Sequence, residues 1–137
     1  MALIAGLGAA AEVAVRDRDA RWTRCGEIRQ RALAALQPLG AEFNGDPAQV
    51  LDHVLNLRFP GIDSEALMVA LKPWVAISNG SACTSSSYTP SHVLRAMGQT
   101  EDQANEAVRL SWCHLTPEVD WDDIAKNLSK ILIRGGV

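Results

Sequence analysis

The first 37 residues constrain the fold most, because they predict a single very long helix. Apolar side chains recur at helical spacing through most of Ala2–Leu36. Within Ala9–Gln37 the one residue that disfavours a helix is Gly26, which costs a helix about 1 kcal/mol. We expect the helix to be roughly 50 Å long and to stop at Pro38 and Gly40. A small domain cannot cover a helix of that length, so part of it is expected to pack against something outside these 137 residues.

The remaining residues predict short strands and helices in alternation. Strands are expected at residues 41–46, 53–59, 74–78 and 107–112, and helices at residues 63–72, 89–98, 100–103 and 116–134. Each helix opens on a residue that can cap backbone N–H groups: Asp63, Thr89, Thr100 and Thr116. This order predicts an α+β two-layer domain, with a small sheet covered on one face by helices.

The composition fits one ordinary globular domain and disfavours several functions. The net charge is −3 and the pI is near 5.5, so a basic nucleic-acid-binding face is not expected. The arginines of residues 16–31 are interleaved with acidic residues, as on a solvated helix face. Three cysteines without a Cys-x-x-Cys pair argue against a disulfide framework and against zinc. Glu12 interrupts the N-terminal apolar run, so we expect no signal peptide, no membrane span and a cytoplasmic location.

Cys83 is the most distinctive candidate for chemistry. It lies in the stretch NGSACTSSSYTPSHVLRAMG, residues 79–98, among serines and other small residues. One interpretation is a small residue that happens to lie in a serine-rich turn, and the other is a nucleophile on a mobile loop, which we expect at residues 78–88. No neighbouring cation lowers the pKa of the thiol, so activation would have to come from elsewhere. The residues alone leave both interpretations open.

The other cysteines and the histidines are weaker candidates. His92 follows the loop and could tune Cys83, although a solvent-facing histidine on a helix is the favoured interpretation. His53 and His114 are expected to be structural. Cys25 lies on the apolar stripe of the long helix, and Cys113 has no metal-ligand spacing with the other cysteines.

The stretch around Cys83 resembles the active-cysteine segment of cysteine desulfurases. These pyridoxal-phosphate enzymes take sulfur from free L-cysteine and release alanine. The residues that fit the pattern are Ser78, Gly80, Ser81, Ala82, Cys83, Thr84, Ser85, Pro90, Ser91, Val93, Leu94, Ala96 and Gly98. Counterparts of NGD at residue 44, HVLNLRF, DSEALMVAL and AVRLSW follow in the family's order, so the resemblance covers nearly the whole chain. It implies that Cys83 is the catalytic thiol that receives the sulfur as a persulfide.

Arg109 is the second candidate that the resemblance supplies. The segment EAVRLSW is similar to the family's strand whose arginine grips the substrate carboxylate. A guanidinium suits a carboxylate because it offers a fork of donors. Without the resemblance, Arg109 would be interpreted as an exposed arginine on a sheet. The family usually continues with glycine and a basic residue, whereas this chain has Trp112-Cys113-His114.

The family's cofactor-binding domain has no counterpart in this sequence. The lysines Lys72, Lys126 and Lys130 all fall in or at the ends of predicted helices, and none resembles the Schiff-base lysine. The resemblance therefore implies that residues 1–137 are the C-terminal small domain of a fold-type-I enzyme, with residues 1–37 as the linking helix. Pyridoxal phosphate would be bound by the absent large domain, with no cofactor-binding and no metal-binding residue in this chain, and the full-length enzyme would be a homodimer.

The resemblance also implies a sulfur-acceptor protein as partner. Relatives serve iron–sulfur cluster assembly, tRNA thiolation or DNA phosphorothioation, and the sequence of residues 78–94 is nearest the phosphorothioation branch. Two other functions are kept open. One is a non-catalytic binding or regulatory module that retains the small-domain fold. The other is a thiol-redox protein, which is disfavoured because no resolving cysteine lies near Cys83 in the sequence.

Overall fold

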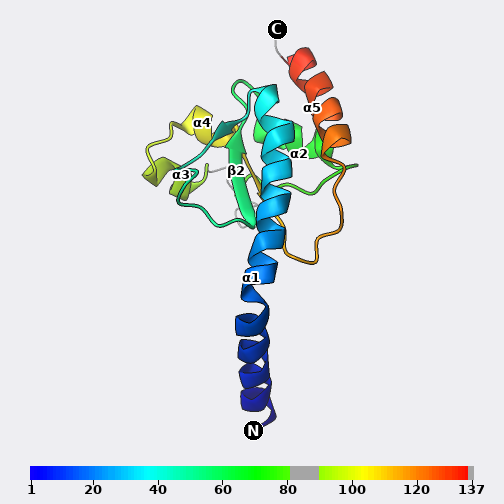
Figure 1. Cartoon of the computed structure of the whole chain (residues 1–137). Coiled ribbons are helices and arrows are strands. Elements are labelled where there is room, and N and C mark those ends of the chain that lie inside the picture. Colours follow the sequence, from blue (N-terminus) through cyan, green and yellow to red (C-terminus); the bar gives the residue numbers. More distant parts are fainter. Residues whose placement is uncertain (81–89, 136–137) are drawn as a thin grey trace.

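The computed structural model describes residues 1–80 and 90–135. A single long helix, α1 (Ala2–Leu36), lies along the domain with its C-terminal part and extends beyond it with its N-terminal part (Figure 1). The helix has 35 residues, as predicted, and passes into the short 3-10 helix η1 (Gln37–Leu39). Gly40 then turns the chain with a φ of 83°, a conformation that a glycine adopts without strain. The predicted stop at Pro38 and Gly40 is confirmed.

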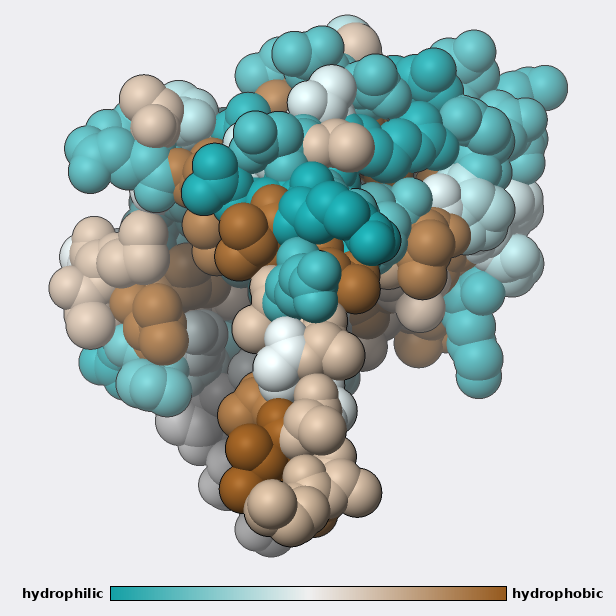
Figure 2. Space-filling view, turned by 60° about the horizontal axis from the view of Figure 1, so that its bottom comes forward, coloured by the Kyte–Doolittle hydropathy of each residue, from teal (hydrophilic) through white to brown (hydrophobic). Residues whose placement is uncertain are grey.

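The domain covers only the C-terminal part of α1. The buried residues of the helix are Cys25, Ile28, Ala32 and Leu36, which share one face at helical spacing. Near the other end, Leu3, Ile4 and Leu7 are 90%, 72% and 73% exposed. This end projects from the domain and presents a mostly apolar surface (Figure 2). No helix in the described ranges combines the length and the apolar character needed to cross a membrane.

The sheet has three antiparallel strands in the order β1-β2-β3. They are β1 (Glu42–Phe43), β2 (Val54–Arg58) and β3 (Ala107–Ser111). The prediction of a strand at residues 74–78 is wrong, since the backbone there makes a single bridge, between Ser78 and Arg109. The physical reason lies just upstream: the N–H groups of Trp74 and Val75 both donate to Leu71 O, so the chain is still turning out of a helix.

The main core lies on one face of the sheet. Leu55 and Leu57 of β2 are fully buried there, beside Val108 and Leu110 of β3. Helices α1, α2 (Ser64–Leu71) and α5 (Trp121–Gly135) supply the other side of this core. The predicted α+β class and the alternation of β2 are confirmed.

Two short helices pack against one end of the opposite face. These are α3 (His92–Ala96) and α4 (Glu101–Asn105). Leu94 and Ala104 form a small cluster with Ala107, at the beginning of β3. The middle of β3 on this opposite face is therefore not covered by the main core or by this small cluster.

Two of the four predicted helix starts are confirmed. Asp63 Oδ1 accepts from the N–H groups of Glu65 and Ala66, and Thr100 forms the expected capping box. The other two predicted starts are wrong. Helix α3 is capped by Ser91, whereas the expected Thr89 lies outside the described residues.

The last helix also begins later than predicted. Asp120 Oδ1 accepts from Asp123 N at 2.9 Å and so marks the start of α5. The hydroxyl of Thr116, which was expected to cap this helix, instead accepts from Cys113 N at 2.9 Å. The threonine therefore stabilises the turn after β3, where its hydrogen bond has the same form as a helix cap.

Candidate functional site

Arg109 lies in the middle of β3 with its side chain directed away from the main core. Its neighbours Val108 and Leu110 are buried, and Arg109 is exposed, as the alternation of a strand requires. Its guanidinium makes no ion pair and no hydrogen bond with any residue of the described ranges. Arg109 is therefore an available cationic fork of donors on a rigid strand.

The backbone on both sides of Arg109 is paired. Arg109 N donates to Ser78 O at 2.6 Å, and Ser78 N donates to Arg109 O at 3.1 Å. On the other side of the strand, Asn56 of β2 is the residue directly opposite Arg109. These pairings fix the position of Arg109 between the sheet and the segment that leads toward Cys83.

Cys83 itself lies outside the described residues, which stop at Gly80 and resume at Pro90. Ser78 Oγ accepts from Gly80 N at 3.1 Å, and Gly80 has a φ of 84°. A Cβ placed on Gly80 would lie 4.0 Å from Ser91 Cβ. Gly80 and Ser91, on either side of the residues outside the described ranges, therefore lie close together. Ser78, two residues before Gly80, is joined to Arg109 by backbone hydrogen bonds.

Acidic groups near this part of the sheet are already paired with a different arginine. Arg58 of β2 makes ion pairs with Glu42 at 2.6 Å and with Glu106 at 2.8 Å. Glu106 also accepts from Gly61 N at 2.7 Å. These two carboxylates are thus engaged with Arg58 and do not pair with Arg109.

The two described cysteines have different surroundings. Cys25 is buried, which raises the pKa of its thiol by desolvation, and its backbone oxygen accepts from Trp112 Nε1 at 3.1 Å. Cys113 is exposed, two residues after the end of β3. Both are free thiols, and the prediction that Cys25 is a core residue is confirmed.

The histidines and acids do not assemble a metal site in the part of the chain that the structure describes. No group of three or more His, Cys, Asp or Glu side chains lies close enough there to hold an ion. His92 is exposed in the first turn of α3, as expected of a solvent-facing histidine, while His53 and His114 are half-buried.

The residues of this chain do not fit a pyridoxal-phosphate site. The cofactor needs a lysine in an enclosed site, and the chain has three lysines: Lys72, Lys126 and Lys130. All three are exposed, and Lys130 Nζ donates to Asn127 Oδ1 on its own helix at 3.2 Å. None lies beside Arg109 in the sheet.

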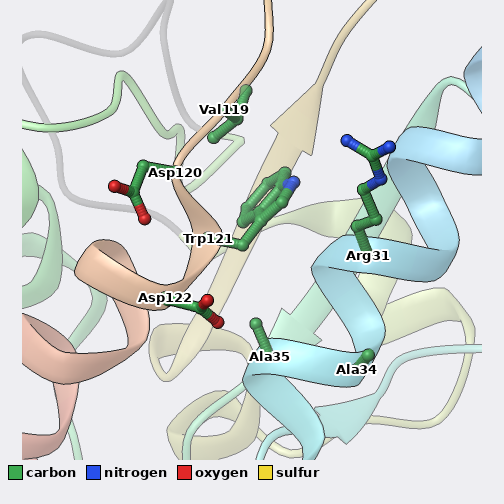
Figure 3. A pocket seen from close by; sticks show the side chains of 7 residues that line it. All are labelled: Arg31, Ala34, Ala35, Val119, Asp120, Trp121 and Asp122. Atoms are coloured by element: carbon green, nitrogen blue, oxygen red, sulfur yellow. The ribbon is translucent and has the colours of Figure 1, made fainter.

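A surface cleft of about 380 Å³ lies between α1 and the beginning of α5 (Figure 3). Arg31 and two alanines line it from α1, and residues 119–122 line it from the other side. Next to it, Glu118 bridges Arg24 and Arg31, and the hydrogen bond from Arg24 is the main cause of its lowered pKa. The cleft lies among the helices that cover the core face and contains no residue of the sheet, so it is separate from Arg109.

Known proteins of one kind resemble this chain along most of its length. No protein-family profile matches it. The cysteine desulfurase IscS of Methylobacillus flagellatus is 38% identical over 120 residues, and that of Vibrio atlanticus is 39% identical over the same length. Both alignments cover 87% of this chain. The chain is homologous to cysteine desulfurases. It spans 29% and 30% of the length of these two relatives.

Solved structures give the same result for this cysteine desulfurase homologue. A NifS-like protein matches 90% of this chain and 31% of its own length, with a TM-score of 0.73 and 26% identity. DndA from Streptomyces lividans matches 79% of this chain and 30% of its own length, with a TM-score of 0.58 and 36% identity. The resemblance inferred from the stretch around Cys83 is therefore confirmed, and the fold is that of part of these proteins.

Proposed function

We propose that this chain is the C-terminal small domain of a cysteine desulfurase. In this proposal Arg109 binds the carboxylate of L-cysteine, and Cys83 takes the sulfur atom. The overall change is balanced: L-cysteine and the thiol of Cys83 give alanine and a persulfide on Cys83. The observation that carries the proposal is the unpaired guanidinium of Arg109, held by backbone hydrogen bonds against Ser78, five residues before Cys83.

Pyridoxal phosphate is the cofactor that the homology implies. We propose that it is bound outside these 137 residues, because the three exposed lysines provide no site for it. The chain by itself is then inactive, and its contribution is the thiol and the carboxylate site. We further propose that the complete enzyme is a cytoplasmic homodimer.

The persulfide sulfur is proposed to pass to an acceptor protein. DNA phosphorothioation is the use that the sequence of residues 78–94 favours, with iron–sulfur cluster assembly and tRNA thiolation as alternatives. The identities to IscS and to DndA are similar, 38% and 36%, which supports a shared sulfur-transfer chemistry more than any one acceptor.

The experiment is to replace Cys83 with serine in the complete enzyme and to measure alanine release from L-cysteine with added reductant. A serine hydroxyl is a poor nucleophile toward sulfur, so Cys83→Ser should abolish alanine release and the added sulfur seen by mass spectrometry. The matched controls are Cys25→Ser and Cys113→Ser, which should retain turnover. A persulfide that maps to Cys113, or normal turnover in Cys83→Ser, would refute the role of Cys83.

A non-catalytic module is the second candidate, because an exposed set of lysines also suits a domain without a cofactor. The same experiment separates the two functions. A complete protein that binds neither pyridoxal phosphate nor L-cysteine, and releases no alanine even with all its cysteines intact, would establish the binding module.

A further inference from the structure

A row of polar side chains crosses the sheet at the level of Arg109. Its members come from neighbouring strands and segments in the order Asn44, Asn56, Arg109 and Ser78. Asn44 N donates to Asn56 O at 3.1 Å, and Asn56 lies opposite Arg109 in the register of β2 and β3. Two backbone hydrogen bonds then join Arg109 to Ser78. Hydrogen bonds or strand register thus connect each member of the row to the next.

Asn56 and Arg109 form the closer of the two kinds of antiparallel pair. The N–H and C=O of Arg109 both point toward Ser78, because both are bonded to it. Asn56 O likewise points the other way, toward Asn44 N. The pair is therefore one without mutual hydrogen bonds, in which Cα atoms lie about 4.5 Å apart and side chains approach most closely.

Asn44 holds the amide of Asn56 in one orientation. Asn44 Nδ2 donates to Asn56 Oδ1 at 2.7 Å, so the oxygen of Asn56 is occupied and its Nδ2 remains as a donor. Asn44 is 5% exposed, and its own Oδ1 has no hydrogen-bond partner in the described ranges. The next residue, Gly45, turns the chain with a φ of 99°, and a Cβ on it would lie 3.2 Å from Met97 Cε. The turn thus fixes the position of Asn44, and the hydrogen bond from Asn44 Nδ2 orients the amide of Asn56.

The row therefore presents two unused donors side by side. Asn56 Nδ2 and the guanidinium of Arg109 make no hydrogen bond with any residue of the described ranges. The nearby carboxylates Glu42 and Glu106 are paired with Arg58. A planar carboxylate has two oxygens with lone pairs enough for both a guanidinium and an amide.

We propose that Asn56 binds the substrate carboxylate together with Arg109, and that Asn44 is a positioning residue that orients Asn56. This inference rests on the proposed function, because it takes Arg109 as the carboxylate site. It adds a neutral donor to a charged one, so that both oxygens of the carboxylate have hydrogen-bond partners.

The test compares variants of the complete enzyme by the KM for L-cysteine, by kcat, and by equilibrium dialysis with L-alanine, which keeps the carboxylate and lacks sulfur. Asn56→Ala should raise the KM and the L-alanine dissociation constant about tenfold, since a hydrogen bond to a charged group is lost. Asn56→Asp has the same shape and still accepts from Asn44, but it presents an anion to the carboxylate and should bind more weakly than Asn56→Ala. Asn105→Ala, a matched amide at the end of α4, should change neither constant.

The outcomes separate this inference from the proposed function. If Arg109→Ala leaves the KM and the L-alanine constant unchanged, the carboxylate site itself is wrong and the inference fails with it. If Arg109→Ala weakens both while Asn56→Ala or Asn56→Asp binds as the parent does, the inference is overturned and the function of Arg109 stands. A fall in kcat alone in Asn56→Ala, with both constants unchanged, would also overturn it.

The role of Asn44 has its own readout. Asn44→Ala should weaken binding in the parent enzyme and should add nothing when Asn56 is already alanine, because it acts through Asn56. Additive losses in the double variant would show that Asn44 does not orient Asn56. Far-UV circular dichroism of each variant establishes that the compared proteins are folded.

Discussion

Replacing Trp112 with phenylalanine should lower the free energy of unfolding of this domain more than the exchange of one aromatic side chain for another usually does. The indole Nε1 donates to two backbone oxygens, Asp52 O at 2.8 Å and Cys25 O at 3.1 Å. Trp112 follows β3, Asp52 precedes β2, and Cys25 is in the first buried turn of α1. A single N–H group therefore joins the long helix to the ends of two paired strands, in a side chain that is 8% exposed.

The expected loss is about 2–3 kcal/mol of the free energy of unfolding, the sum of the three contributions that follow. Removing the indole N–H deprives two backbone oxygens of a shared donor, which costs about 1 kcal/mol or somewhat more. The smaller ring gives up on the order of 50 Å² of buried apolar area, about 1 kcal/mol at roughly 25 cal/mol per Å². The remaining contribution is the cavity left beside Cys25, since a packed interior relaxes only in part.

Urea unfolding followed by far-UV circular dichroism measures the effect without relying on the fluorescence of the altered residue. With a slope of about 1–3 kcal/mol per molar urea, the midpoint should fall by about 0.7–3 M. Trp74→Phe is the matched control, because Trp74 is 44% exposed and its indole makes no hydrogen bond in the described ranges. Equal midpoints for Trp112→Phe and Trp74→Phe would refute the argument that the shared indole hydrogen bond ties α1 to the sheet.

Three further predictions concern the cofactor, pH and a helix cap. The 137-residue chain should retain no pyridoxal-phosphate absorbance after dialysis, because its lysines are exposed; a retained band would contradict this. The lowered pKa of Glu118 stabilises the fold above its ordinary value of 4.5, and this stability is lost as pH falls through the lower, folded value. Urea unfolding of Glu118→Gln should therefore show a smaller loss of stability below about pH 4.5. Asp63→Ala should cost about 1 kcal/mol in the same assay, since two N–H groups of α2 lose their acceptor.

The elements that the sequence predicted well are those whose evidence is local. Within Ala9–Gln37 the helix α1 has one weak breaker, Gly26, in a long periodic stretch, and it forms without interruption. Leu55 and Leu57 alternate with polar residues, and both are fully buried in β2. The capping box at Thr100 is complete in four residues and is present as expected. In each case the competing conformation has little local support.

The predictions that failed depend on a partner elsewhere in the chain. Residues 74–78 have the composition of a strand, but a strand also needs a paired edge, and β3 offers this segment a bridge at Arg109 alone. Thr116-Pro117 has the form of a helix start, yet Asp120 supplies the cap and Glu118 pairs with Arg24 and Arg31 instead of opening a helix. The local sequence is compatible both with the predicted strand or helix start and with the conformation that forms. Contacts with distant parts of the chain decide between the two.

The candidate site could be predicted from the sequence in part. The resemblance pointed to Arg109, and the structure places it exposed on a strand, as an arginine that binds a ligand must be. The amide row beside it required strand register, because Asn44, Asn56 and Arg109 are separated by 12 and 53 residues in the sequence. The one hint in the sequence was that Asn56 falls on the polar face of an alternating strand, which is equally typical of a solvated side chain.

In the proposed site, recognition of the carboxylate and transfer of the sulfur are assigned to different parts of the chain. Arg109 and Asn56 are on strands whose backbones are bonded on both sides, so their positions change little when a ligand binds. The thiol of Cys83 belongs to the segment that follows Gly80, and Ser78 joins the beginning of that segment to Arg109. Changes in the row should therefore appear in the KM for L-cysteine, whereas changes at Cys83 should appear in turnover with the L-alanine dissociation constant unchanged. A Cys83→Ser enzyme that loses L-alanine binding as severely as Arg109→Ala would show that the two roles are not separable in this fold.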